Sequence, residues 1–105
     1  MEDTLALDDA ARAELLPALL DAAQQNLDGA AAKSLRDLAK ARTDIATAMF
    51  AMLAKLPVTK ATGNFALDLG TDFRHDARTK TVLGIWAEKG NADVKRQARR
   101  GLQKI

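Results

Sequence analysis

The hydrophobic positions of this chain recur mostly with the spacing of an α-helix, and no stretch alternates strictly between apolar and polar residues as a half-buried strand does. Alanine is abundant, and β-branched residues are scattered rather than clustered. The pattern therefore predicts an all-α fold, a bundle of five or six helices.

The N-terminal part predicts two helices. The first follows the candidate caps Asp8 and Asp9, and Pro17 within its pattern allows two short pieces or one helix that starts near Leu16. A turn separates it from the second helix, for which Asp28 is the expected cap. The inward positions are Leu15, Leu16, Leu19, Leu20 and Ala23, then Ala31, Leu35 and Leu38, while Lys33, Arg36, Asp37 and Lys40 are expected to face water.

The third predicted helix, Asp44 to Leu56, is the most apolar part of the chain. Large residues occupy one face and alanines most of the other, and only Asp44 and Lys55 carry charge. This composition predicts a central helix that neighbours pack against on all sides. Pro57 disfavours helical backbone in Leu56 and so ends the helix, and Thr59 is the expected cap of the next one.

The C-terminal part predicts three more helical pieces. A short one spans 61–69, interrupted by Gly63 and ended by Gly70. The chain restarts at 71–72 and continues as a longer helix to Lys89. Gly90 stops that helix, Asn91 caps the last one, and its apolar stripe is Val94, Ala98, Leu102 and Ile105.

The composition fits one globular domain over residues 1–105, with 1–8 as a flexible tail. The chain is 48% hydrophobic and 29% charged, and it contains no cysteine, which suits a reducing compartment. No apolar run reaches the roughly 20 residues that span a bilayer, so we expect no membrane association. The acidic start, Met1-Glu2-Asp3-Thr4, does not have the basic and apolar regions of a signal peptide.

Charge is unevenly distributed around the net +2. Acids dominate residues 1–30, whereas the last helix is basic. Such a helix suits weak, non-specific contact with nucleic acid, or is simply the solvated face of an amphipathic helix. The basic residues in question are Lys95, Arg96, Arg99 and Arg100.

The residues needed for catalysis or metal binding are scarce. His75 is the single histidine, so neither a zinc cluster nor a broad choice of Ser–His pairs is available. The glycines do not have the spacing of a phosphate-binding loop. We therefore expect no enzyme, no catalytic residue, no cofactor and no metal.

Two segments read together carry a family resemblance. The first is TDIATAMFAMLAKLPVTKAT, residues 43–62, and the second is KTVLGIWAEKGNADVKRQARRGLQKI, residues 80–105. Their order and spacing resemble the TFIIS N-terminal domain family, which includes elongin A and the LEDGF integrase-binding domain. The matching residues are Leu53, Leu56, Pro57, Val58 and Thr59, then Lys80, Val82 and Ile85, then Val94, Ala98 and Leu102. The Leu-Arg-Lys-His signature of the family reads Ile85-Trp86-Ala87-Glu88 here, and its terminal Trp is absent.

The resemblance implies a compact right-handed bundle that binds short disordered motifs, typically a Phe flanked by acids, of transcription or chromatin factors. It further implies a pocket between two interhelical connections, with an apolar floor and basic residues that meet the acids. The corresponding residues are Leu38, Arg42 and Asp44 on one connection and Trp86, Lys89 and Asn91 on the other. Leu38 and Trp86 are equally compatible with ordinary core, and Asp44 and Asn91 are first of all expected caps.

Other readings stay open at this point. The basic last helix permits a nucleic-acid-binding domain, although it contains no aromatic residue for stacking on bases. The segments ELLPALLDAAQ and ADVKRQARRGLQKI are similar to the two helices of a HEAT unit, which permits a HEAT-like scaffold, but no repeat period is sustained. We expect a monomer, nuclear if the resemblance holds and cytoplasmic otherwise.

Overall fold

The computed structural model describes the backbone of residues 9–105 and the side chains of residues 15–105, so the tail predicted over 1–8 lies outside the described residues. Between residues 9 and 105 the chain forms α-helices and one short 3-10 helix without any strand, which confirms the all-α bundle. The helices are α2 (Asp9–Gln25), α3 (Ala30–Ala41), α4 (Thr43–Lys55), η1 (Val58–Lys60), α5 (Gly63–Asp72), α6 (Ala77–Lys89) and α7 (Ala92–Gln103).

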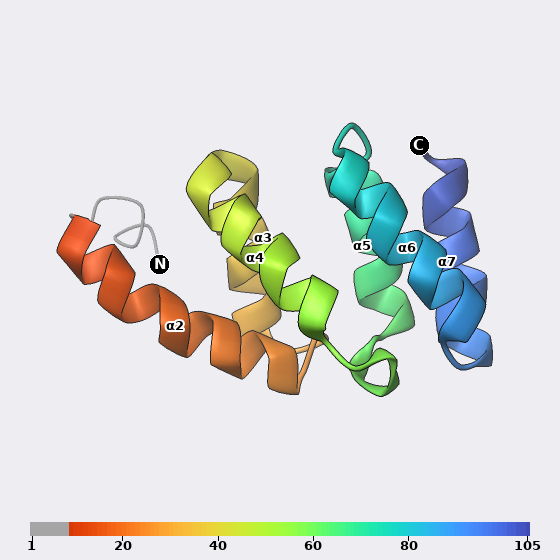
Figure 1. The fold of residues 1–105 in the computed structure, drawn as a ribbon, viewed down its shortest axis with the longest axis horizontal. Coiled ribbons are helices and arrows are strands. Elements are labelled where there is room, and N and C mark those ends of the chain that lie inside the picture. The colour runs from red at the N-terminus through yellow and green to blue at the C-terminus, as the bar shows by residue number, and fades with distance from the viewer. Residues whose placement is uncertain (1–8) are drawn as a thin grey trace.

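The helices form two groups of three. Helices α2, α3 and α4 pack against one another, and so do α5, α6 and α7, whereas α4 and α6 provide the main backbone contact between the groups. In Figure 1, α4 and α6 lie toward the viewer, α3 and α5 lie behind them, and α7 closes the right-hand end. The molecule is accordingly longer in one direction than in the others, 40 × 25 × 19 Å.

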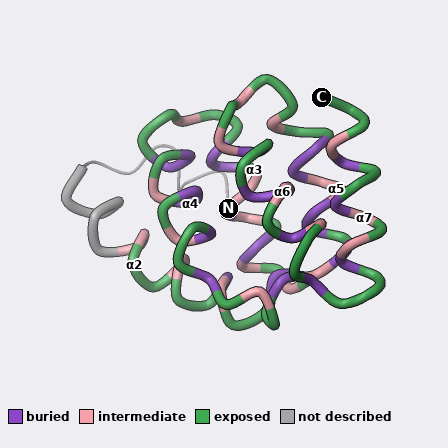
Figure 2. Tube along the Cα trace, turned by 45° about the vertical axis from the view of Figure 1, so that its right-hand side comes forward, coloured by how far each residue is buried: buried purple, intermediate pink, exposed green. Residues whose placement is uncertain are grey.

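Apolar side chains from both groups meet in one core. Figure 2 shows buried and exposed residues alternating along the helices, as amphipathic packing requires. Phe65 and Trp86 lie fully inside, with ring centroids 6.3 Å apart, and Phe50 meets Phe73 edge-on at 5.6 Å. The largest fully buried side chains are Trp86, Phe65, Leu27, Leu35, Met49, Leu69, Leu83, Val94 and Thr79.

Several helix ends differ from the predicted ones. Helix α2 runs continuously through Pro17 instead of dividing or starting beside it. Helix α3 has Gly29 at its N-cap and therefore no side-chain cap, and the carboxylate of Asp28, one residue earlier, accepts a hydrogen bond from the Thr62 hydroxyl at 2.9 Å. Thr62 also caps α5 by accepting from the Phe65 N–H, whereas Thr59 lies in η1 and caps nothing. These hydrogen bonds tie the α2–α3 connection to the start of α5.

Gly70 does not end a helix. It lies inside α5, where a Cβ atom would come within 2.5 Å of the Cα of Gly101 in α7. The two helices therefore approach backbone to backbone at these glycines, and the close approach explains why the positions have no side chain. Gly63, where an interruption was predicted, is instead the first residue of α5. Residues 71–72, where a new helix was predicted to start, belong to the last turn of α5.

Candidate functional site

The six residues of the predicted pocket are present in the structure mainly as core and helix-end residues. Leu38 is 7% exposed and Trp86 2% exposed, so both belong to the core. Arg42 precedes α4 and lies 3.7 Å from the carboxylate of Asp44, which stands in the first turn of that helix rather than at its cap. Asn91 does cap α7, since its Oδ1 accepts from the Val94 N–H at 2.9 Å.

The structure does not bring the two predicted connections together. In Figure 1 the α3–α4 connection lies at the top and the α6–α7 connection at the bottom. Between the two connections the chain forms three helices, α4, α5 and α6, each running opposite to the one before. After three such helices the chain lies at the end of the bundle opposite to the one from which it started. One pocket that contains both Arg42 and Lys89 is therefore not formed.

A hollow does lie beside the α3–α4 connection, but its partner is the α5–α6 connection. It measures about 280 Å³ and its walls are largely polar. The charges in it are already matched: Lys40 lies 3.9 Å from Asp72, and Arg78 lies 2.7 Å from Asp76. Such a wall of matched charges offers little to an additional ligand.

A longer depression runs between α4 and α6, and we call it the α4–α6 groove. It consists of two hollows of about 360 and 310 Å³ that share Ala54, Thr81 and Val82. The larger hollow, beside the middle of α4, is the upper one in the view of Figure 1, and it is almost entirely apolar. The smaller, lower hollow lies beside the end of α4 and reaches Leu56 and Val58 beyond it. The residues that line the groove are Thr47, Phe50, Ala51, Leu53, Ala54, Leu56, Val58, Arg78, Thr81, Val82, Ile85, Trp86 and Lys89.

The spacing of residues along the two helices explains the shape of the groove. On α4 the exposed wall is Thr47, Ala51 and Ala54, which fall on one stripe because residues three and four apart share a helix face. All three side chains are small, so this wall is low. On α6 the facing wall is taller, and it includes Ile85, which is 46% exposed.

Beneath these walls lies the aromatic and aliphatic core. Phe50 and Leu53 from α4, with Val82 and Trp86 from α6, are at most 6% exposed and close the groove from below. The floor is therefore continuous with the core of the protein, and a ligand in the groove would extend that core. Surface of this kind is more often covered than left to water.

Arg78 closes the upper end of the groove. Its guanidinium lies 4.6 Å from the centroid of the Phe50 ring and donates to the Thr47 hydroxyl at 3.3 Å. It also donates twice to Asp76, from Nε to Oδ1 at 3.0 Å and from Nη2 to Oδ2 at 2.7 Å. This fork of hydrogen bonds lowers the pKa of Asp76 below its ordinary value, against a smaller opposing effect of burial.

The lower end of the groove carries an unpaired cation. Lys89 lines the lower hollow, and within the described residues it forms no ion pair. No acidic residue lines either hollow of the groove, whereas both charged lining residues, Arg78 and Lys89, are cations. An occupant with negative charge near Lys89 is thus favoured over a positive one.

Helix α7 presents the predicted basic surface. Among the cations of α7 and Lys104, which directly follows the helix, Arg96 pairs with Asp93 at 2.6 Å. The other four, Lys95, Arg99, Arg100 and Lys104, form no ion pair within residues 15–105. The buried residues Val94, Ala98 and Gly101 hold the opposite side against α5 and α6. The predicted apolar stripe of α7 is therefore present at Val94 and Ala98, whereas Leu102 is half-buried and Ile105, beyond the end of the helix, is 49% exposed.

The described side chains include no cluster of metal ligands. Nowhere in residues 15–105 do three or more His, Asp or Glu side chains gather as metal ligands. His75 is exposed in the α5–α6 connection, where its Nε2 accepts from the Arg74 Nε at 3.3 Å. In the described part of the chain, no helix combines the length and the apolar character needed to cross a bilayer.

Comparison of the chain with protein-family models, with curated proteins and with solved structures finds no match. The resemblance to the TFIIS N-terminal domain family therefore stays a prediction.

Of the six residues predicted for a pocket between the two connections, Trp86 and Lys89 line the α4–α6 groove instead, and the other groove residues were not predicted as site residues. The prediction that neighbours surround α4 was wrong, because Ala51 and Ala54 are exposed. The sequence contained one sign of the groove, namely short side chains on one helix and a large apolar residue, Ile85, on another. Small residues on one helix and a large apolar residue on another are recognised as the two sides of a groove only when the helices are known to be neighbours.

Proposed function

We propose that this chain is a non-catalytic protein-interaction module that binds a short segment of another protein in the α4–α6 groove. The segment has an apolar anchor, such as Phe, flanked by acidic residues. The observation that carries the proposal is the groove itself: an apolar depression above the core that no acidic residue lines, with the cation Lys89 at its lower end. An apolar anchor supplies most of the affinity of such a site, and the acids supply orientation.

The dimensions and the exposed surface support this function. The two hollows together are large enough for several side chains, since pockets for small ligands begin at about 300 Å³. Ile85 is one of the two large apolar side chains that are exposed in residues 15–105, and it stands on the groove wall. The resemblance to the TFIIS N-terminal domain family adds the class of partner, transcription or chromatin factors, and a nuclear location. These last two parts of the proposal rest on that resemblance alone.

The test is a nuclear magnetic resonance titration of the whole chain with a short acidic peptide that contains one Phe. Chemical shifts should change at Ala51, Ala54, Thr81 and Ile85, and Ala51→Glu should weaken binding at least tenfold, since it places a negative charge in the apolar centre. Ala22→Glu is the matched control, because Ala22 is also an exposed helical alanine and lines neither hollow. Shift changes confined to α2 or α7, or equal affinity in both variants, would refute the proposed site.

A second candidate function is weak, non-specific contact of α7 with nucleic acid, as a separate surface. It is favoured by the four cations in and directly after that helix that form no ion pair within residues 15–105, because such cations replace counterions along a phosphate backbone. Replacing Arg96, Arg99 and Arg100 together with Gln should abolish this contact and leave the thermal unfolding midpoint nearly unchanged, since these side chains are exposed. Specific binding of one DNA sequence at nanomolar affinity and physiological salt would contradict both this candidate and the interaction module.

A further inference from the structure

The α4–α6 groove has little hydrogen-bonding capacity along its walls. Along the upper hollow both walls are continuous helix, so most of their backbone N–H and C=O groups already bond within α4 and α6. Only the last carbonyls of the two helices, beside the lower hollow, have no partner within their own helix. The two threonine hydroxyls are engaged as well: Thr47 donates to the carbonyl of Thr43 at 3.0 Å, and Thr81 donates to that of Ala77 at 3.4 Å. The remaining lining residues between Arg78 and Lys89 are apolar, apart from the indole N–H of Trp86 at the lower hollow.

This lack of partners restricts the conformation of whatever fills the groove. Along this part of the groove an extended peptide would bury backbone N–H and C=O groups that find few partners, and a buried group without a partner weakens binding. A helix satisfies these groups internally and presents only side chains. Resting on the proposed function of the groove, we propose that the segment it binds is an amphipathic α-helix, packed as a third helix upon α4 and α6.

The dimensions of the groove give this helix its length and pattern. Helix α6 spans 13 residues, which corresponds to about 20 Å at the rise of an α-helix. A helix of about 13–15 residues covers it, with apolar residues at positions i, i+3, i+4 and i+7 toward the groove. The small side chains of α4, Ala51 and Ala54 among them, leave room for the close axial approach of about 8–10 Å at which helices interlock.

The charges and the helix directions give the orientation. In Figure 1, α4 and α6 both run from top to bottom, so their C-terminal ends lie together near Lys89. A bound helix that runs antiparallel to both places its positive N-terminal end beside the negative ends of α4 and α6. Acidic residues in its first turn then meet Lys89 and also suit their own helix dipole.

Selection from two matched peptide libraries displayed on phage tests the inference, with the whole chain as the bait. Both libraries hold acidic peptides of about 15 residues with randomised apolar residues at helical spacing, and in one of them two interior positions are Pro, which prevents a continuous helix. We expect binders from the library without Pro. Their circular dichroism should gain helix on binding. Ala51→Glu should weaken them by at least about tenfold and Lys89→Glu by about threefold to tenfold, whereas Ala22→Glu should not.

The other outcomes separate the two levels of the proposal. Groove-dependent binders that come only from the library with Pro would overturn the helical occupant and leave the proposed function standing. Failure of both libraries to yield a binder sensitive to Ala51→Glu would overturn both. A dimer in sedimentation that Ala51→Glu dissociates would show that a second copy of the chain fills the groove, and would also overturn the proposal.

Discussion

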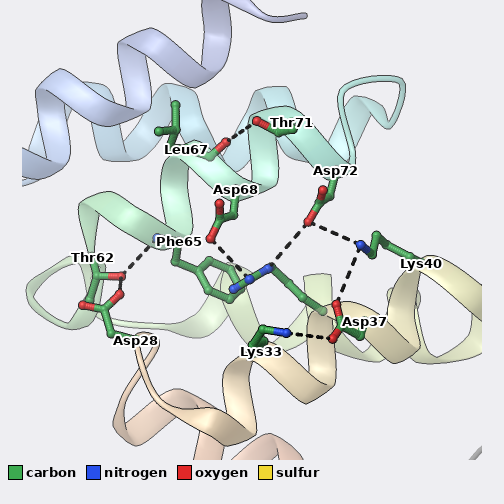
Figure 3. Close-up of polar contacts among 11 residues, drawn as sticks. Asp28, Lys33, Asp37, Lys40, Thr62, Phe65, Leu67, Asp68, Thr71 and Asp72 are labelled. Carbon is green, nitrogen blue, oxygen red and sulfur yellow. Dashed lines mark hydrogen bonds and ion pairs between the residues drawn. The ribbon is translucent and has the colours of Figure 1, made fainter. Parts of the chain in front are cut away.

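Two places where the helix groups meet contrast with each other. Helices α3 and α5 meet through ion pairs, and we call this contact the α3–α5 seam. In it, Arg36 of α3 lies 3.2 Å from Asp68 and 3.8 Å from Asp72, both in α5. Figure 3 shows this network, in which Lys40 also reaches Asp72. The α4–α6 groove, at the front, is open and apolar. The same pair of groups is therefore joined by polar contacts on one side and leaves an apolar surface uncovered on the other.

The difference arises from side-chain length. The Arg36 side chain is long enough to cross from α3 to α5, and its guanidinium lies 5.3 Å from the centroid of the Phe65 ring. On α4 the corresponding outer positions are Thr47, Ala51 and Ala54, which are too short to reach across to α6. At the seam, the long Arg36 side chain covers the apolar surface between the helices. At the groove, the short side chains of α4 leave such surface uncovered. Unused apolar surface is where binding is expected.

The largest expected effect comes from breaking the floor of the groove. Leu53 is 3% exposed in the core, so Leu53→Ala should lower the free energy of unfolding by about 2–5 kcal/mol through lost burial and a cavity. Ile85→Ala on the exposed wall is the control and should cost less than about 1 kcal/mol. Urea denaturation measures both. Equal losses would show that the groove has no buried floor.

A smaller effect is expected from breaking the α3–α5 seam. The side chain of Arg36 is 13% exposed, so Arg36→Met should cost about 1–3 kcal/mol by leaving Asp68 without its partner and Asp72 with Lys40 alone, less than at a fully buried pair because water reaches both aspartates. Lys33→Met is the control: it removes an ion pair of α3 whose lysine side chain is 72% exposed, worth at most about 0.5 kcal/mol. If both variants unfold at the same urea concentration, the seam does not stabilise the fold.

The smallest effect concerns acid at the upper end of the groove. Because the folded pKa of Asp76 is lowered below 3.8, its bond with Arg78 stabilises the fold fully above that pH and is lost as the pH falls through the lowered pKa. Asp76→Asn preserves a capping side chain but removes the charge, so this variant should lose less stability between about pH 5 and about pH 2 than the parent does. Arg78→Met should likewise make the stability depend less on pH over this range. Thermal melts across this range measure the slopes, and an unchanged slope in both variants would contradict the assignment.

Much of the fold follows from local signals in the sequence. Helical periodicity, the Pro57 stop and the Asn91 cap predict elements whose ends the structure reproduces closely. The failures have tertiary causes. Asp28 has the residue type of a cap but bonds to Thr62, which is 34 positions away, and Gly70 is required by Gly101 rather than by a turn.

The candidate site was harder to predict, since it depends on the relation between helices. Arg36 was expected to face water because its helix position is polar, yet α5 covers it and supplies two carboxylates. Ala51 and Ala54 were expected to be covered, yet no element of the described chain lies over them. Periodicity establishes which face of a helix is apolar, but not which neighbour will cover it.

The placement of the two walls of the groove has a mechanical consequence. One wall, α4, belongs to the first group of helices and the other, α6, belongs to the second. The width of the groove is therefore the distance between two bodies, and the ion pairs of Arg36 on the far side help to hold that distance. Salt screens such partly exposed pairs, so ionic strength should act on the groove from its far side as well as through the two charged residues that line it, Arg78 and Lys89.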